Sequence, residues 1–280
     1  MPCSIAWLCR TLEVSRSGCS ARRRPRRPTR QLRRPEVAAA IAALLQTRPA
    51  SYGYRRIHAL LRRQGLWCNP KTVYALMRRH QWLASTRQPT RRPGRRHEGQ
   101  VAVAEPNRRW ASDFTWIKTW DGQKVRLAVI VDCADRMVLA WRCAPRLTAD
   151  DLGEVVREAL WGRFGADLTR ARGLEFLSDH GPEYKATRFL ADLVRLGLIP
   201  CHTPCRSPES NGIAEAFFGS FKRDYVYQSG LETVAEIERL LPGWIEDYNE
   251  VAPHSALGMR APAQFYREWG VKNGLRPVHN

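Results

Sequence analysis

Three acidic residues have the type and placement that divalent-metal chemistry requires. Asp179 follows a short apolar run at 174–177, at the point where a buried strand would end. Glu215 begins an amphipathic segment whose apolar residues recur at helical spacing. Asp113 lies further upstream, between Ser112 and Phe114, in a segment that has the composition of a strand. Because magnesium prefers carboxylate oxygens, an acid at a strand end that faces one on a helix predicts a divalent-cation site.

Each of these acids also has a purely structural interpretation. Asp113 is compatible with a half-exposed strand, although its neighbours Phe114 and Trp116 indicate a buried setting that disfavours a lone carboxylate. Asp179 is compatible with a plain turn, and Glu215 with a first-turn acid that favours the helix dipole. The metal interpretation is favoured because it accounts for all three residues together.

The spacing of these residues resembles that of a known class of enzymes. Between Asp179 and Glu215 lie 35 residues, and Lys222 follows seven residues after Glu215, two helical turns along. This set resembles the catalytic triad of DDE transposases and retroviral-type integrases. The surrounding segments most resemble the second-frame (OrfB) transposase of the insertion-sequence-three family, and they are Ser207-Pro-Glu-Ser-Asn-Gly-Ile-Ala-Glu, Lys222-Arg-Asp-Tyr-Val and Tyr248-Asn-Glu-Val-Ala-Pro-His-Ser-Ala-Leu.

The resemblance implies a function and a cofactor. It implies a transposase that cleaves a strand at each element end and transfers the freed 3′ hydroxyl to another phosphodiester. Asp113 would bridge two Mg²⁺ or Mn²⁺ ions, Asp179 and Glu215 would each hold one, and Lys222 would contact DNA. Two alternatives stay open at this point: a metal-dependent nuclease of the same fold, and a DNA-binding regulator without catalytic activity.

The resemblance also bears on partners and on one departure from the family pattern. It implies a homo-oligomer on element-end and target DNA, and it allows a fusion with the product of an upstream reading frame. The family usually has an arginine before Pro-His in its C-terminal motif, whereas this chain has Ala252. If that arginine contacts DNA or packs, activity would be weakened here.

Charge is distributed unevenly along the 280 residues. The chain holds 46 Lys and Arg against 27 Asp and Glu, and residues 1–100 contain 23 of the basic residues but only 3 of the acidic ones. Residues 101–280 therefore hold 23 basic and 24 acidic residues, so the whole net charge of +19 belongs to the first third. This asymmetry predicts a polyanionic partner, most simply DNA, rather than a merely soluble surface.

The basic first third contains the pattern of a helix-turn-helix unit. A helix is expected from Pro35, a second after Ser51-Tyr-Gly-Tyr, and a third from Asn69 and Pro70, which suit a cap and a first helical position. The basic residues predicted to contact DNA lie on the second and third helices, and they are Arg55, Arg56, Lys71, Arg78 and Arg79. An ordinary three-helix bundle with a basic coat is the alternative.

The rest of the chain predicts an α/β core. Apolar segments at 110–117, 125–132, 137–143, 174–178 and 199–203 are expected to be strands. Helices are expected from Thr148, around 189–196, at Glu215 and over 233–249, where Pro242 should kink or split the helix. Three consecutive strands followed by alternating helices and strands indicate a mixed sheet covered by helices. The resemblance makes this an integrase core with the ribonuclease-H-like fold.

The predicted organisation has five parts. They are a short helix with an Arg/Pro linker at 1–34, the helix-turn-helix domain at 35–85, a basic linker at 86–104, the catalytic core at 105–270 and a tail at 271–280. No segment has the layout of a membrane span or a secretory signal, so a bacterial cytoplasmic protein acting at the chromosome is expected.

Other candidate ligands carry weaker signals. The eight cysteines are scattered, and Cys201-His-Thr-Pro-Cys205 lacks a second ligand pair, so no zinc site is expected. Asp132 ends an apolar strand and is the strongest competitor for the catalytic acid, along with Asp135, Asp150 and Asp151. His180 is most simply a turn residue. No glycine-rich nucleotide loop is present in the sequence, so ATP use is not expected.

Overall fold

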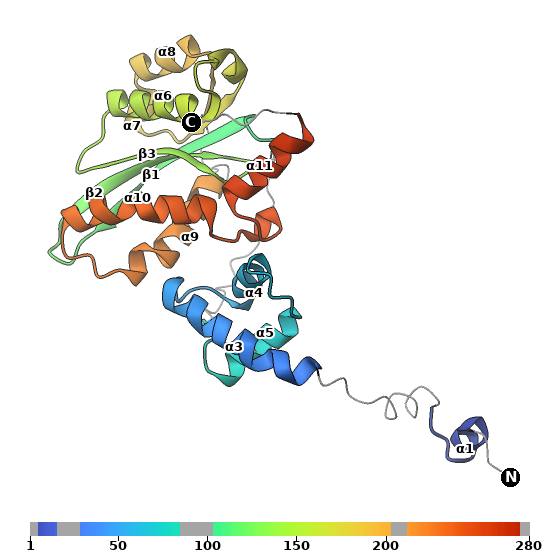
Figure 1. Ribbon diagram of the computed structural model, residues 1–280. Helices are drawn as coiled ribbons and strands as arrows, with labels where there is room; N and C mark the ends of the chain where they lie inside the picture. The colour runs from blue at the N-terminus through green and yellow to red at the C-terminus, as the bar shows by residue number, and fades with distance from the viewer. Residues whose placement is uncertain (1–4, 16–28, 85–102, 203–211, 275–280) are drawn as a thin grey trace.

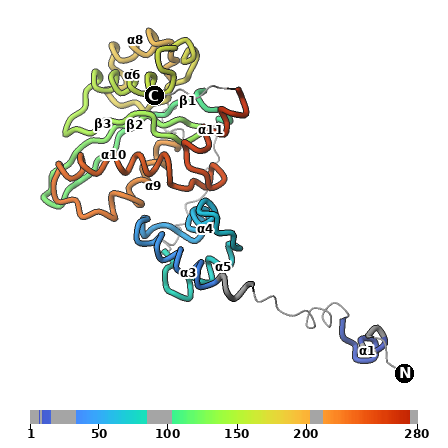
Figure 2. The backbone as a smooth tube through the Cα atoms, in the orientation of Figure 1, coloured from blue at the N-terminus to red at the C-terminus, as the bar shows by residue number. Residues whose placement is uncertain are grey.

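Figure 1 shows the computed structural model, which describes residues 5–15, 29–84, 103–202 and 212–274. A short helix, α1 (Ile5–Thr11), stands apart from the rest in both Figure 1 and Figure 2. A small helical lobe lies beneath a larger core, which consists of a sheet with helices on both faces. A loop is predicted at 205–212 from the sequence, and all of it except Gly212, which begins α9 (Gly212–Asp224), lies outside the described residues, as does most of the predicted basic linker.

The helical lobe consists of α3 (Thr29–Thr47), α4 (Tyr54–Arg63) and α5 (Pro70–Arg79). The side chain of Asn69 accepts a hydrogen bond of 2.9 Å from the backbone N–H of Lys71, which caps α5 as predicted. One boundary was wrong, because α3 begins at Thr29 and contains Pro35, which was expected to open the helix. A proline inside a helix keeps a helical φ and removes one backbone donor, and here the helix continues through it.

The core contains a mixed sheet of five strands in the order β3-β2-β1-β4-β5. The central strand β1 (Arg109–Lys118) pairs antiparallel with β2 (Lys124–Asp132), which pairs antiparallel with β3 (Val138–Ala144). On its other side β1 pairs parallel with β4 (Glu175–Ser178), and β4 pairs parallel with β5 (Ile199–His202). The predicted mixed sheet is therefore confirmed.

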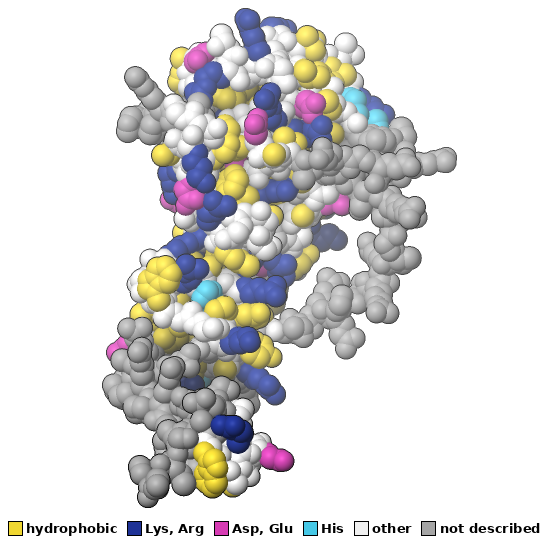
Figure 3. Space-filling view, turned by 90° about the vertical axis from the view of Figure 1, so that its right-hand side faces the viewer, with side chains coloured by type: hydrophobic (Ala, Val, Ile, Leu, Met, Phe, Trp, Pro, Cys, Tyr) yellow, Lys and Arg dark blue, Asp and Glu magenta, His cyan; other side chains and the backbone are white. Residues whose placement is uncertain are grey.

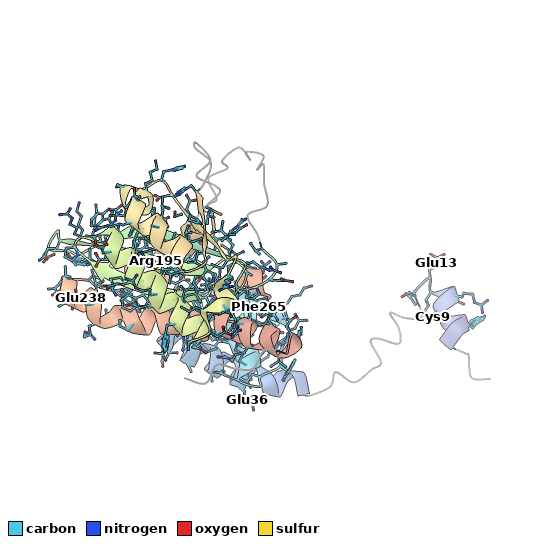
Figure 4. The ribbon with its side chains drawn as sticks, turned by 90° about the horizontal axis from the view of Figure 1, so that it is seen from above. Cys9, Glu13, Glu36, Arg195, Glu238 and Phe265 are labelled. Carbon is cyan, nitrogen blue, oxygen red and sulfur yellow. The ribbon has the colours of Figure 1, made fainter. Side chains whose placement is uncertain are left out.

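Alternation along the strands divides the core into two apolar layers. Trp110, Ala128 and Ile130 face α6 (Ala149–Phe164) and α8 (Thr187–Arg195). Residues of the opposite parity, such as Ala111 and Val129, face α9 (Gly212–Asp224) and α10 (Val234–Glu250). Figure 4 looks down on these layers, with Arg195 on α8 and Glu238 on α10.

Two helices of the core begin with a capping box, and a proline inside one of them does not interrupt it. Thr148 and Asp151 form a reciprocal capping box at the start of α6, as predicted, and Thr233 and Glu236 form another before α10. Pro242 does not split α10, which runs unbroken over Val234–Glu250. Two helices were not predicted, namely α7 (Pro182–Lys185) and α11 (Pro262–Lys272), and both begin at a proline.

The helical lobe is joined to the core by ion pairs and a shared apolar cluster. Arg48 pairs with Asp247 of α10, and the carboxylate of Asp224 in α9 accepts bonds of 2.5 Å from Ser51 and Arg56. Ala252, only 3% exposed, packs into the apolar cluster of the lobe. Ala252, where the family usually has an arginine, therefore lies at the contact between the helical lobe and the core.

Candidate active site

The paired strands β1 and β4 position Asp113 and Asp179. Ala111 of β1 pairs in parallel with Leu177 of β4, the last residue pair of this register. Asp113 follows two residues later in β1, and Asp179 is the first residue after β4. Asp113 shares its face of β1 with Ala111, which packs in the layer beneath α9. The charge of Asp179 acts on Asp113, which is consistent with two carboxylates close together at this point of the sheet.

Glu215 comes from the first turn of α9, where its side chain is exposed. The helix is fixed by Ala214, Phe217 and Phe221, which are buried in the cluster that also contains Ala111 and Val129. Since the apolar stripe faces the sheet, Glu215 lies at the border of that stripe, at the N-terminal end of α9.

The charges of Asp179 and Glu215 both act on the carboxyl group of Asp113. Burial is the main reason that the pKa of Asp113 rises to about 6, and the charges of Asp179 and Glu215 act in the same direction. A hydrogen bond of 2.7 Å from the backbone N–H of Phe114 opposes the rise. Because Asp113 interacts with both other acids, the structure brings the three predicted residues into one acidic centre.

This centre is an open arrangement and not a closed cage. Across residues 5–15, 29–84, 103–202 and 212–274, no three carboxylate, imidazole or thiol side chains are grouped closely enough to hold a metal ion. The donor set, three carboxylates without imidazole or thiolate, suits a hard cation such as Mg²⁺ or Mn²⁺.

The turn after β4 fixes the position of Asp179. Its carboxylate accepts a hydrogen bond of 2.9 Å from the backbone N–H of Gly181. A Cβ atom at position 181 would lie 3.0 Å from that same oxygen, a contact tighter than side chains normally make. Glycine at this position therefore lets the backbone approach the acid closely.

Arg126 is a neighbour of the acids that sequence reasoning missed. Its guanidinium lies 3.8 Å from the centre of the Phe114 ring, pairs with Glu183 of α7 and lowers the pKa of Asp113. Position 126 lies across from Trp116 on the adjacent strand, a register that only the sheet pairing reveals. The sequence signal was an arginine within an otherwise apolar strand.

Asp132 and Asp135, the competing acids, have a different role. Both are fully buried and pair with Arg163 of α6, whose guanidinium lies 3.5 Å from the centre of the Tyr266 ring of α11. Asp132 also accepts a bond of 3.2 Å from the indole N–H of Trp110. Asp132 and Asp135 therefore belong to a buried network of ion pairs and hydrogen bonds that stabilises the fold.

The predicted DNA-contacting residues divide into two groups. Arg55, Lys71, Arg78 and Arg79 are exposed on the helical lobe. Arg56 is turned toward the core, where it pairs with Asp224, and its side chain is only 19% exposed. Lys222 is half-buried on α9. Figure 3 shows Lys and Arg side chains along one face of both the core and the lobe.

Comparison with known proteins identifies the class to which the chain belongs. Two models described as an integrase core domain match residues 103–208 and 197–262, and an HTH-like domain matches residues 31–90. An uncharacterised protein of insertion element IS136 from Agrobacterium fabrum is 45% identical over 181 residues, 63% of this chain and 91% of that protein. Transposase InsD of insertion element IS2 from Escherichia coli is 39% identical over 232 residues, 80% of this chain and 76% of InsD. The chain belongs to the insertion-element transposases.

The predicted resemblance to the insertion-sequence-three family is thereby confirmed, and this transposase is a DDE-type polynucleotidyl transferase of DNA transposition. Its fold is that of an integrase core. A chain of the simian T-cell lymphotropic virus intasome, solved with a PP2A regulatory subunit, aligns with a TM-score of 0.50 at 19% identity, over 81% of the transposase and 74% of that chain.

Two further observations concern the described residues alone. No helix among them is long and apolar enough to cross a bilayer. Cys68, Cys133, Cys143 and Cys201 are free thiols, and Cys205 of the rejected zinc motif lies outside the described residues.

Proposed function

We propose that Asp113, Asp179 and Glu215 are the catalytic residues of this transposase and hold two divalent cations, Mg²⁺ or Mn²⁺. The observation that carries the proposal is the electrostatic coupling of Asp113 to both other acids in a partly buried position. A fold that forces carboxylates together raises their free energy unless a cation or a proton neutralises them. Burial of Asp113 thus favours cation binding.

Each side chain has a distinct task in the proposal. Asp113, on which the charges of both other acids act, would be the shared ligand, while Asp179 and Glu215 would each complete one cation position. Bound cations of this kind activate the attacking oxygen and stabilise the leaving oxygen of a phosphodiester. Gly181 holds Asp179 in place through its N–H, and the apolar stripe of α9 holds Glu215.

The reaction proposed is strand cleavage at each element end, followed by attack of the freed 3′ hydroxyl on a phosphodiester of target DNA. In the joining step one phosphodiester replaces another, so no external energy source is required. The exposed basic residues of the helical lobe, Arg55, Lys71, Arg78 and Arg79, would hold the DNA through its phosphates. The family resemblance supports a homo-oligomer on DNA, a fusion with an upstream reading-frame product, and action at a bacterial chromosome.

The experiment that tests this function uses labelled DNA carrying the terminal repeats that flank the gene. We expect the full-length transposase with Mg²⁺ to give both cleaved ends and strands joined to target DNA. A metal-dependent nuclease would give cleaved ends without joined products. A regulator would bind the ends and leave both strands intact.

A further inference from the structure

A cavity whose lining includes none of the three acids lies beside the C-terminal end of α9. It measures about 560 Å³ and is enclosed by the end of β1, the β1–β2 turn, the C-terminal half of α9 and the segment that follows α9. Its polar and aromatic lining consists of Trp116, Lys118, Trp120, Lys222, Tyr227 and Ser229. The proposed catalytic function makes no use of this cavity.

Aromatic rings are unusually exposed around the cavity. Trp120 is 82% exposed, Tyr227 72% and Trp116 41%, although large aromatic side chains are normally withdrawn from water. An exposed group of such side chains in a concave place indicates a surface that a ligand covers. Flat rings with free faces are suited to stacking on another flat ring.

The cavity wall is held in position before any ligand arrives. The backbone N–H of Trp120 donates a hydrogen bond of 2.8 Å to the carbonyl of Leu231, which ties the β1–β2 turn to the segment after α9. The turn is closed by a bond of 3.0 Å from the Thr119 N–H to the Gln123 carbonyl. The ammonium of Lys124 lies 4.7 Å from the centre of the Trp116 ring. The backbone that carries Trp120 is therefore fixed relative to the segment after α9.

Charge within the cavity favours an anionic ligand. Lys118 and Lys222 contribute ammonium groups, and no acidic residue lines the cavity. Lys222 is half-buried and forms no ion pair with any residue that the structure describes. Burial lowers the pKa of Lys222, which shows that its ammonium is partly withdrawn from water without a carboxylate to compensate. A phosphate would supply the missing partner.

The cavity also lies at a defined distance from the acids. Trp116 follows Asp113 by three residues on β1, a rise of about 10 Å at roughly 3.3 Å per residue. Lys222 follows Glu215 by seven residues on α9, a rise of about 10 Å at 1.5 Å per residue. Both elements place the cavity about three nucleotide steps from the acids, at roughly 3.4 Å per step of a DNA strand.

We propose that this cavity binds an unpaired nucleobase of DNA close to the scissile phosphate, stacked on Trp120 and Tyr227 with its phosphate on Lys222. This inference rests on the proposed function, because it places the base relative to the catalytic acids. A paired base keeps both faces covered by its neighbours in the stack, so the strand must open locally to fill the cavity. Stacking on aromatic rings accepts any base and so needs no sequence-specific contact.

The test uses the full-length transposase with Ca²⁺ in place of Mg²⁺, so that DNA is bound without being cut. The probes are a single-stranded oligo-dT of roughly ten nucleotides and a duplex of the same length, followed by fluorescence anisotropy. We expect Trp120→Ala and Tyr227→Ala each to weaken oligo-dT binding at least about fivefold and to leave duplex binding unchanged. The matched control is Trp161→Ala, which removes a tryptophan of 66% exposure from α6, outside the cavity lining.

A second arm locates the bound base. Element-end duplexes carry 2-aminopurine at successive positions near the cleaved end, and its fluorescence falls when the base stacks on an aromatic ring. We expect quenching at one position about three steps from the scissile phosphate, lost in Trp120→Ala and kept in Trp161→Ala. Equal weakening of single-stranded and duplex binding, no weakening, or a Trp120→Ala effect on oligomeric state alone would each overturn the proposal. Because binding is read without chemistry, failure here is separable from failure of the acid triad, which is read by joining.

Discussion

At the scale of single residues, Asp113 is a half-buried acid whose pKa is raised by burial and by the charges of Asp179 and Glu215. Its position could be predicted only in part from the sequence. The flanking Phe114 and Trp116 indicated burial, and the family resemblance selected Asp113 over Asp132. The structure explains that choice physically, because the carboxylate of Asp132 is satisfied by Arg163 and Trp110, whereas that of Asp113 faces two other acids.

The raised pKa of Asp113 predicts how the stability of the metal-free protein depends on pH. The folded-state pKa is about 6 against an ordinary value of 3.8, so the fold favours the protonated form. The stabilisation from that form is complete below pH 3.8 and is lost as the pH rises through about 6. Asp113→Asn should therefore raise the free energy of unfolding at pH 8 by up to about 3 kcal/mol.

Thermal unfolding of both proteins between pH 4 and pH 8, with and without Mg²⁺, measures this effect. Added Mg²⁺ should raise the melting temperature of the wild type above pH 6 and have little effect on Asp113→Asn. A wild type whose stability in EDTA is the same as that of the variant across this range would contradict the assignment.

At the scale of elements, strands and capped helices could be predicted because their signals are local. Apolar runs predicted the strands, and the Thr148 cap and the Asn69 cap predicted two helix starts. The helix α11 could not be predicted, because its burial depends on a distant partner: Tyr266 covers the Arg163 guanidinium of α6. The register that joins Asp113 to Asp179 is likewise a property of the sheet and not of either strand.

The network around Arg163 predicts a large stability effect far from the chemistry. Arg163→Ala leaves Asp132 and Asp135 buried without their cation, which should lower the free energy of unfolding by roughly 3–5 kcal/mol. Arg188→Ala, which breaks an exposed pair with Asp150, is the control and should cost less than about 1 kcal/mol. Urea unfolding of the two variants compares them. Similar midpoints would show that the buried network contributes little.

At the scale of the whole molecule, the charge asymmetry along the sequence separates the basic helical lobe from the nearly neutral core. The basic lobe is docked onto α9 and α10, the helices that follow and support Glu215, through Asp224 and Asp247. The domain boundaries at 34, 85, 104 and 270 remain predictions. The docking itself could not be predicted, because a basic residue that pairs with the core and one that faces DNA look alike in a sequence.

Two adjacent arginines test this division of labour. Arg55 is exposed and should act on DNA, so Arg55→Ala should weaken duplex binding and reduce its salt dependence by about one phosphate contact. Arg56 pairs with Asp224, so Arg56→Ala should leave the salt slope unchanged and loosen the joint between lobe and core. Salt-dependent anisotropy and limited proteolysis measure the two effects. Identical salt slopes for both variants would count against the docked role of Arg56.

The most direct measurement of the central claim is strand joining by acid-to-amide variants on labelled element-end DNA with Mg²⁺. Asp113→Asn, Asp179→Asn and Glu215→Gln keep the shape of each side chain and remove its charge. We expect each to lose joined and cleaved products by at least about a thousandfold while DNA binding in Ca²⁺ persists. Asp150→Asn, an exposed acid on α6, should join at the wild-type rate. Retention of joining in any of the three variants would remove that residue from the catalytic centre.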